Sequence, residues 1–161
     1  MNKKIKNIFL NSPFKSAKHS SYFYAYEELF SEFVDKKLTF VEVGILNGGS
    51  LFMWKNYFGK KARIIGIDNN PSSKCSEKFG FEIHTGNQAD PNFWSKFHKK
   101  VGKFDILLDD GGHLDIQQAT TLFENIDYIN DGGLIVIEDT HSSYLKKFGN
   151  PSNKSFMNLV F

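Results

Sequence analysis

The regular alternation of short apolar runs with amphipathic stretches constrains this chain most strongly. The apolar runs occupy residues 39–44, 63–68, 81–84, 104–109 and 134–138. Continuous runs rich in β-branched residues are typical of strands that are buried on both faces, as in parallel sheets. The amphipathic segments, which predict helices, occupy residues 22–37, 50–58, 90–100 and 115–129. Strands that alternate with helices predict a doubly wound, Rossmann-like α/β sheet, and we expect the order 3-2-1-4-5.

Three parts of the chain follow from this pattern. Residues 1–37 form an expected polar arm, up to about residue 20, and a helix; residues 38–145 form the core; residues 146–161 form a short C-terminal segment. No apolar run follows the fifth strand, so that strand would be an exposed apolar edge of the sheet, which proteins normally cover. We therefore expect either a truncated chain or a partner subunit over this edge, and a homo-oligomer.

Composition excludes several classes of protein. The formal net charge is only +2, with 20 basic and 18 acidic residues, which argues against binding of nucleic acid. Cys75 is the sole cysteine, so no disulfide can form within the chain. The apolar run near the N-terminus, Ile8-Phe9-Leu10, is too short for a signal peptide, and no stretch is long enough to span a membrane. These features predict a cytoplasmic protein.

A glycine-rich turn follows the first predicted strand. Gly44 ends that strand, Gly48 and Gly49 permit close approach of a ligand to the backbone, and Ser50 is expected to cap the next helix. The spacing Gly-x-x-x-Gly-Gly differs from the Gly-x-Gly-x-x-Gly of dinucleotide enzymes. The turn indicates either a cofactor site or only a tight connection.

Polar residues also follow the second and third strands. Asp68 ends the second strand, where an acid can accept hydrogen bonds from both hydroxyls of a ribose, or can simply stabilise the following turn. The side-chain amides of Asn87 and Gln88 follow the third strand and could bind an adenine edge. Asp90 is expected to cap the next helix, with Pro91 in its first turn.

Acidic residues and a histidine gather at the ends of the last two strands. Asp109, Asp110 and His113 follow the fourth strand, and Glu138 and Asp139 follow the fifth. Neighbouring carboxylates repel one another unless a cation lies among them, and oxygen ligands suit Mg²⁺. His113 is placed to act as a general base. The alternatives are a capping Asp110 with a solvated His113, or a zinc site with His141, although zinc prefers cysteine and several histidines.

Tyr144 lies just beyond the acids of the fifth strand. It could line an acceptor site, or it could serve as a packing residue.

Together these segments resemble class I S-adenosylmethionine-dependent methyltransferases. More narrowly, they are similar to the metal-dependent sugar O-methyltransferases of the macrocin and mycinamicin type and to the cephalosporin-hydroxylase-like group. The resemblance covers residues 38–145. The segments that carry it read Glu-Val-Gly-Ile-Leu-Asn-Gly-Gly-Ser-Leu (42–51), Gly-Ile-Asp (66–68), Gly-Asn-Gln-Ala-Asp (86–90), Asp-Asp-Gly-Gly-His (109–113), Gly-Gly-Leu-Ile-Val-Ile-Glu-Asp-Thr (132–140) and Ser-Tyr (143–144).

The resemblance implies a role for each matching residue. The implied cofactor-binding residues in the glycine turn are Glu42, Gly44, Asn47, Gly48 and Ser50. Asp68 would bind the ribose, Asn87 and Gln88 would lie near the adenine, and Asp109 would bind the amino end of the cofactor. Mg²⁺ ligands would be Asp110, Glu138 and Asp139, and His113 would deprotonate the acceptor hydroxyl. Two departures stand out: Asn87 occupies a position where the family commonly has an acid, and the family's sheet has two further strands after the fifth.

The resemblance implies Mg²⁺-assisted transfer of a methyl group from S-adenosylmethionine to the hydroxyl of a sugar or another small molecule or glycan. Asp110 and His113 would be the catalytic residues. Two other functions stay open: an NAD-dependent enzyme of similar topology, and a truncated or inactive cofactor-binding subunit that acts through a partner.

Overall fold

A five-stranded parallel sheet forms the centre of the chain. The computed structural model describes residues 4–148 and 153–161. The strands are β1 (Thr39–Val43), β2 (Arg63–Asp68), β3 (Glu82–Thr85), β4 (Phe104–Asp109) and β5 (Ile129–Ile137). All four pairings between neighbours are parallel, and the order β3-β2-β1-β4-β5 confirms the predicted α/β topology.

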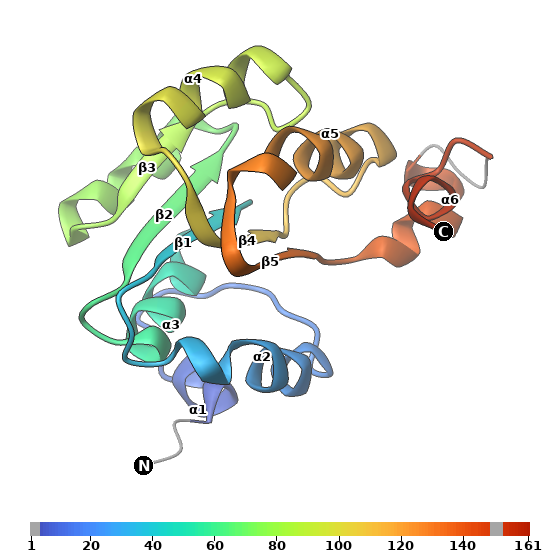
Figure 1. The fold of residues 1–161 in the computed structure, drawn as a ribbon. Coiled ribbons are helices and arrows are strands. Elements are labelled where there is room, and N and C mark those ends of the chain that lie inside the picture. Colours follow the sequence, from blue (N-terminus) through green and yellow to red (C-terminus); the bar gives the residue numbers. More distant parts are fainter. Residues whose placement is uncertain (1–3, 149–152) are drawn as a thin grey trace.

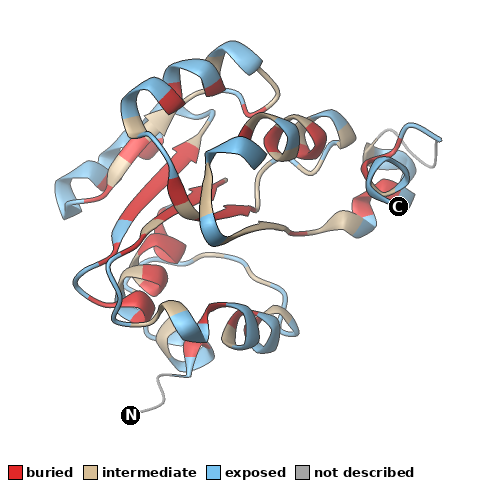
Figure 2. Cartoon of the chain, viewed as in Figure 1, coloured by how far each residue is buried: buried red, intermediate tan, exposed pale blue. Residues whose placement is uncertain are grey.

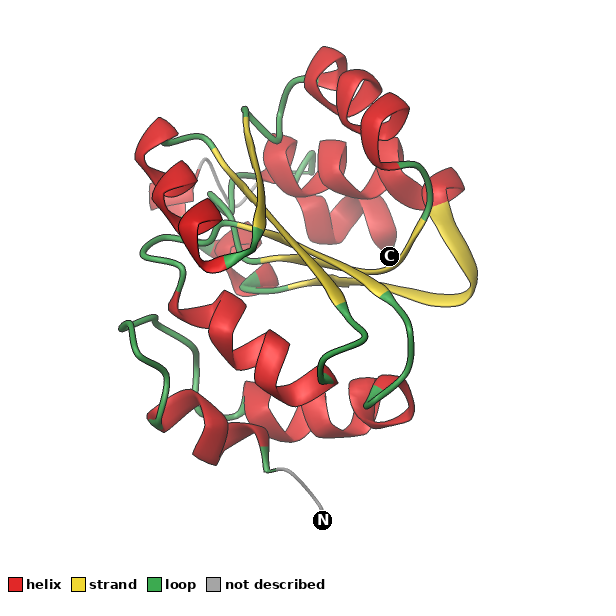
Figure 3. Ribbon diagram, turned by 90° about the vertical axis from the view of Figure 1, so that its left-hand side faces the viewer, coloured by secondary structure: helices red, strands yellow, loops and turns green. Residues whose placement is uncertain are grey.

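Helices cover both faces of the sheet (Figures 1 and 3). The α-helices are α1 (Ile5–Leu10), α2 (Tyr22–Phe30), α3 (Gly49–Phe58), α4 (Pro91–Val101), α5 (Asp115–Asn125) and α6 (Phe156–Val160). The 3-10 segments are η1 (Ser31–Phe33), η2 (Pro71–Phe79), η3 (Ile126–Tyr128), η4 (Thr140–Tyr144) and η5 (Lys146–Phe148). In Figure 1, α1, α2 and α3 lie on one face, α4 and α5 lie on the other, and α6 packs beside α5. Within the described ranges, no helix combines the length and apolar character needed to cross a bilayer.

Two hydrophobic clusters lie on opposite faces of the sheet. In β1, Phe40 belongs to the cluster beneath α1, α2 and α3, whereas Val41 belongs to the cluster beneath α4. This division follows from the alternation of side chains along a strand. Phenylalanine contributes to both clusters, and Figure 2 shows the central strands as buried. β5 is only partly buried and lies at the edge of the sheet.

The prediction of a polar N-terminal arm up to about residue 20 is wrong for the residues that the structure describes. Residues 5–10 form α1, and Ile5 is fully buried against the core. The α1–α2 connection, residues 11–21, then packs against α3 through a hydrogen bond from Ser12 Oγ to the carbonyl of Gly49. Residues 1–3 of the expected arm and residues 149–152 of the expected C-terminal segment lie outside the described residues.

Several predicted element boundaries also need correction. The helix predicted over residues 22–37 ends at Phe30 and tightens into η1, as the last turn of a helix often does. The helix predicted to end at residue 129 ends at Asn125, followed by η3. β5 begins five residues earlier than predicted, at Ile129, and residues 130–133 form an irregularity in its pairing with β4.

Ser50 does not cap α3. The helix begins at Gly49, and its N-cap is Gly48, which has a φ of 76° and no side chain to accept a hydrogen bond. The hydroxyl of Ser50 instead donates to Glu42 Oε2 at 2.7 Å. The prediction for α4 is confirmed: Asp90 is the N-cap, its carboxylate accepts from the backbone N–H of Asn92, and Pro91 lies in the first turn.

Candidate functional site

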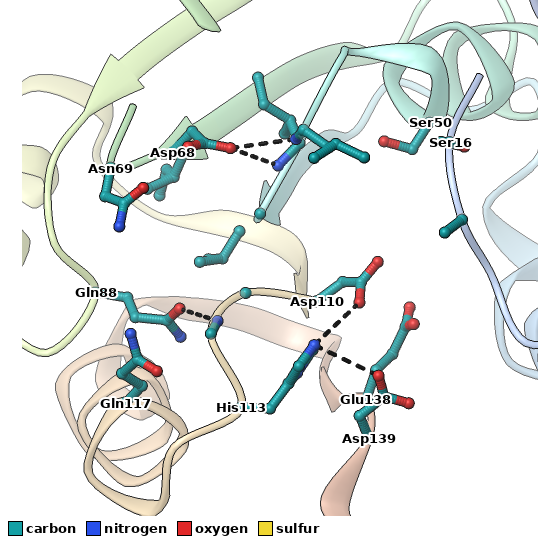
Figure 4. A pocket seen from close by; sticks show the side chains of 18 of the residues that line it. Ser16, Ser50, Asp68, Asn69, Gln88, Asp110, His113, Gln117, Glu138 and Asp139 are labelled. Atoms are coloured by element: carbon teal, nitrogen blue, oxygen red, sulfur yellow. Dashed lines mark hydrogen bonds and ion pairs between the residues drawn. The ribbon is translucent and has the colours of Figure 1, made fainter. Parts of the chain in front are cut away.

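A cavity of about 600 Å³ lies at the carboxyl ends of the strands. Segments after all five strands line it, as expected for an open α/β sheet, and the α1–α2 connection lines it as well. Its lining includes nine residues at which the sequence predicted ligand or metal contacts, namely Gly44, Ser50, Asp68, Asn87, Gln88, Asp110, His113, Glu138 and Asp139. Figure 4 shows the cavity with most of these side chains.

The glycine turn at the end of β1 shapes one wall of this cavity. Gly44 has a φ of 83°, and a Cβ there would lie 2.1 Å from the carbonyl oxygen of Asp110. Glycine therefore allows the turn after β1 to approach the loop after β4. Gly48 and Asn47 do not line the cavity; Gly48 is buried beside Ser76 and Asn47 is exposed. The turn thus brings chain segments together and leaves one side open for a ligand.

Asp68 lies at the opposite end of the cavity from the acidic cluster (Figure 4). Its Oδ2 accepts hydrogen bonds from the backbone N–H groups of Ile45 and Leu46, at 3.1 and 3.2 Å. Its Oδ1 accepts from the N–H of Asn70 at 2.9 Å. The carboxylate therefore stabilises the turn. Oδ1, with one such partner, retains a second lone pair for a ligand, whereas Oδ2 already accepts two hydrogen bonds.

Gln88 and Asp109 form a buried hydrogen-bonded pair. Gln88 Nε2 donates to Asp109 Oδ2 at 2.8 Å and to Thr121 Oγ1 at 3.0 Å, and Gln88 Oε1 accepts from the N–H of Gly112 at 3.0 Å. Burial raises the pKa of Asp109, although these hydrogen bonds oppose the increase. Asp109 does not line the cavity, and the pair fixes the loop that carries His113. Asn87 lines the cavity, with its Oδ1 accepting from the N–H of Ala89.

The second end of the cavity contains the acidic cluster and His113. His113 Nε2 lies 3.9 Å from Asp110 Oδ1 and 3.4 Å from Asp139 Oδ2. One ligand atom from each of these three residues falls within 4.8 Å of the others, a spacing that could hold a metal ion. Glu138 is not part of this group, although it lines the cavity.

Backbone strain concentrates at this site. Among the described residues, four that are not glycine have a positive φ, and three of them line the cavity: Leu46, His113 and Asp139. A left-handed conformation at such a residue costs free energy that the surrounding structure must supply. The fold therefore holds the two cluster residues His113 and Asp139 in orientations that the chain would not adopt on its own.

Lys18 is a buried cation that the sequence analysis missed. Its side chain is 1% exposed, and its Nζ lies 2.7 Å from Asp110 Oδ2, 3.0 Å from Glu138 Oε1 and 3.2 Å from Glu42 Oε1. Burial alone lowers the pKa of Lys18, but the three carboxylates outweigh burial and raise it above its usual value. The ammonium group stays charged and each of its three N–H donors has a carboxylate nearby.

The same network contains Glu42 and Glu138. Glu42 is fully buried and does not line the cavity. Its carboxylate accepts a hydrogen bond from the hydroxyl of Ser50. Burial raises the pKa of Glu138 to about 7, and Lys18 opposes that increase. The hydroxyl of Tyr26 also donates to Glu138 Oε1. The side chain of Glu138 is thus fixed by an ion pair with Lys18 and a hydrogen bond from Tyr26.

Tyr22 is a second residue that the sequence analysis missed. Its hydroxyl donates to Asp139 Oδ1 at 2.6 Å, and burial together with this hydrogen bond raises the pKa of the phenol to about 12. Tyr22 and Tyr26 lie four residues apart on one face of α2, a spacing that the sequence displays. Lys18 itself has no comparable signal, because the α1–α2 connection has no periodic pattern. Tyr144 is 60% exposed and does not line the cavity.

Comparisons with known proteins give a consistent picture. No protein-family model matches the chain. It is 34% identical over 137 residues to 8-demethyl-8-alpha-L-rhamnosyl tetracenomycin-C 2'-O-methyltransferase of Streptomyces olivaceus, covering 80% of this chain and 35% of that protein. It is 32% identical over 135 residues to demethylmacrocin O-methyltransferase of Streptomyces fradiae, covering 80% of this chain and 34% of that protein. The chain thus spans about a third of the length of the curated relatives it matches.

Solved structures confirm the fold. MycE methyltransferase from the mycinamycin biosynthetic pathway, in complex with Mg, SAH and mycinamycin VI, superposes with a TM-score of 0.84 at 23% identity. That match covers 99% of this chain and 46% of the MycE chain. The SAH-bound methyltransferase PaMTH1 of Podospora anserina superposes with a TM-score of 0.60 at 16% identity, covering 97% of this chain and 73% of that chain.

Proposed function

Because this chain has the class I methyltransferase fold and is related to the macrocin- and mycinamicin-type sugar O-methyltransferases, we propose that it binds S-adenosylmethionine and methylates a sugar hydroxyl. One observation carries the proposal. A single cavity joins Asp68, at the end of β2, to the cluster of Asp110, His113 and Asp139. This arrangement provides a ribose ligand at one end and acid–base and metal-binding groups at the other.

Asp68 is the proposed ribose ligand. Its position at the end of the second strand suits hydrogen bonds from the two hydroxyls of an adenosine. Asn69 and Asn87 line the same end of the cavity and offer amide groups to the base. Gln88 lines the cavity but has little capacity left for hydrogen bonds to a ligand, since both the oxygen and the nitrogen of its amide already have partners.

The acidic cluster fits a divalent cation. Two aspartates with a histidine between them supply mainly oxygen ligands, which suit Mg²⁺, and their ligand atoms lie within 4.8 Å of one another. We propose Asp110 and Asp139 as metal ligands, and Glu138 as a neighbour that acts through its network with Lys18. A bound Mg²⁺ would lower the pKa of a coordinated hydroxyl, and S-adenosylmethionine would supply an electrophilic methyl group.

His113 is the proposed general base. Its Nε2 faces both Asp110 and Asp139, so it lies beside the place that the cation and the acceptor hydroxyl would occupy. The acceptor oxygen would attack the methyl carbon as the bond from carbon to sulfur breaks, and the hydroxyl proton would pass to His113 Nε2. The products are a methyl ether, S-adenosylhomocysteine and a protonated histidine, which releases its proton to solvent.

A calorimetric titration tests cofactor binding. In the presence of Mg²⁺, we expect the chain to bind S-adenosylhomocysteine and not NAD. Asp68→Ala should weaken this binding by roughly 1.5–3 kcal/mol, the usual contribution of hydrogen bonds to a charged group, or about 10- to 150-fold. Asp127→Ala, which removes an exposed carboxylate outside the cavity lining, is the control. Binding of NAD in place of S-adenosylhomocysteine would reject the proposal.

His113→Ala separates binding from chemistry. We expect it to leave the affinity for S-adenosylhomocysteine nearly unchanged and to lower turnover roughly 10²- to 10⁴-fold, as loss of a general base does. An equal loss of both would contradict the role of a base. A homo-oligomer stays a prediction, which size measurement in dilute solution tests.

A further inference from the structure

Among the described residues, each of the two aspartates of the cluster accepts a side-chain hydrogen bond through one of its two oxygens. Asp110 Oδ2 accepts a hydrogen bond from Lys18 Nζ at 2.7 Å, while its Oδ1 faces His113 Nε2 at 3.9 Å. Asp139 Oδ1 accepts from the hydroxyl of Tyr22 at 2.6 Å, while its Oδ2 faces the same nitrogen at 3.4 Å. In both carboxylates one oxygen accepts a hydrogen bond, and the other faces His113 Nε2. Figure 4 shows the two oxygens that face His113.

Both holding groups come from outside the strand ends that carry the cluster. Lys18 lies in the α1–α2 connection and Tyr22 is the first residue of α2. Tyr22 also accepts a hydrogen bond from the backbone N–H of Asp139, so it fixes both the backbone and the side chain of that residue. The N-terminal elements therefore set the orientation of groups that the sheet alone only brings near.

We propose that Lys18 and Tyr22 are positioning residues that direct one oxygen of Asp110 and one oxygen of Asp139 toward a shared divalent cation. The inference rests on the proposed function, because that function places the cation among these residues. Groups that bind the outer oxygen of a metal-ligating carboxylate fix its orientation, and their loss typically weakens metal affinity or activity roughly 10- to 100-fold.

The central experiment measures binding of Mn²⁺ alone, by calorimetry, to the full chain. Tyr22→Phe removes only the hydroxyl that holds Asp139, and we expect roughly 10- to 100-fold weaker binding with an unchanged melting temperature. Tyr24→Phe is the matched control, because Tyr24 lies on the same helix with 72% of its surface exposed. Equal affinity in Tyr22→Phe and the parent chain would overturn the role of Tyr22.

A double-mutant cycle tests the route of the effect. If Tyr22 acts through Asp139, Tyr22→Phe should have little further effect once Asp139→Asn is present. Additive effects would contradict the inference.

Lys18→Met separates positioning from charge. Removal of a nearby positive charge should by itself tighten Mn²⁺ binding, whereas loss of orientation should weaken it. We expect weaker binding, and tighter or unchanged binding would overturn the role of Lys18. If Lys18→Met does not fold, Lys18→Arg, which keeps the charge but moves its donors, is measured in the same way with the same expected direction.

The parent chain distinguishes this inference from the proposed function. Absence of Mn²⁺ binding by the parent would overturn the cation site and this inference together. Mn²⁺ binding by the parent, with no effect of Tyr22→Phe or Lys18→Met, would overturn the inference alone.

Discussion

His98 shows how a single buried residue couples stability to pH. The residue is 6% exposed, and its ring stacks on Tyr128 with centroids 3.5 Å apart and places Nε2 2.9 Å from Asn125 Oδ1. Burial lowers the pKa of His98 below its usual value of 6.5, although Asn125 opposes the decrease. The folded chain therefore favours the neutral ring.

This pKa shift gives a prediction for stability. Between the folded pKa of His98 and 6.5, the unfolded chain binds more protons at this residue, so the contribution of His98 to the free energy of unfolding rises with pH. We expect this contribution to fall as the pH drops through 6.5 and to level off below the folded pKa, whereas Glu138, whose pKa is raised to about 7, contributes in the opposite direction. Urea unfolding from pH 5 to pH 8 measures this dependence. His98→Gln, which keeps a donor for Asn125, removes this contribution, so the stability of the parent chain relative to the variant should fall as the pH drops through 6.5; identical profiles would contradict the assignment.

The connection between α1 and α2 shows how one element depends on the shape of another. At Gly49, the first residue of α3, a Cβ would lie 2.3 Å from the carbonyl oxygen of Phe14. The ring of Phe14 also packs on Phe52 of α3 and on Phe79. These contacts hold the segment that places Lys18 in the cavity.

Gly49→Ala tests this dependence. The added methyl group must displace the backbone at Phe14, and forced overpacking typically costs roughly 1–3 kcal/mol of stability. We expect a lower midpoint of urea unfolding and faster tryptic cleavage after Lys15 and Lys18, because the connection would loosen. An unchanged midpoint with unchanged cleavage would show that the connection accommodates the methyl group.

At the scale of the whole molecule, a ligand in the cavity would contact segments after all five strands and the α1–α2 connection. Such a ligand binds only the folded chain, because unfolding separates these segments. Its binding should therefore stabilise the entire fold.

Thermal unfolding with S-adenosylhomocysteine measures this stabilisation. At a ligand concentration of about 100 Kd we expect a gain of roughly 2.7 kcal/mol, which for a chain of this size raises Tm by roughly 5–11 °C. NAD at the same concentration should give no comparable rise. A similar rise with both compounds would show that the cavity does not discriminate between them.

Much of the fold could be predicted from the sequence. The apolar runs predicted the five strands, because parallel strands buried on both faces need continuous apolar residues, and the doubly wound architecture that they indicate predicted the observed order. Asp90 and Pro91 marked the start of α4, since a helix N-terminus has local hydrogen-bonding needs that a few adjacent residues satisfy. Element ends were less well predicted, as at Phe30 and Asn125, because helix termini depend on contacts with the rest of the fold.

The sequence alone determined which strand ends carry the polar residues, and therefore that Asp68, Asp110, His113 and Asp139 would share one edge of the sheet. Tertiary structure decided how these groups pair. The tertiary structure brought Lys18 into a buried ion pair with Asp110, which lies 92 residues away along the chain. It also placed the amide of Gln88 where it donates a hydrogen bond to Asp109. Side-chain pairing across such separations depends on the packing of whole elements, which local sequence patterns do not record. The identity of each segment as strand or helix, in contrast, follows from a periodicity that the segment carries by itself.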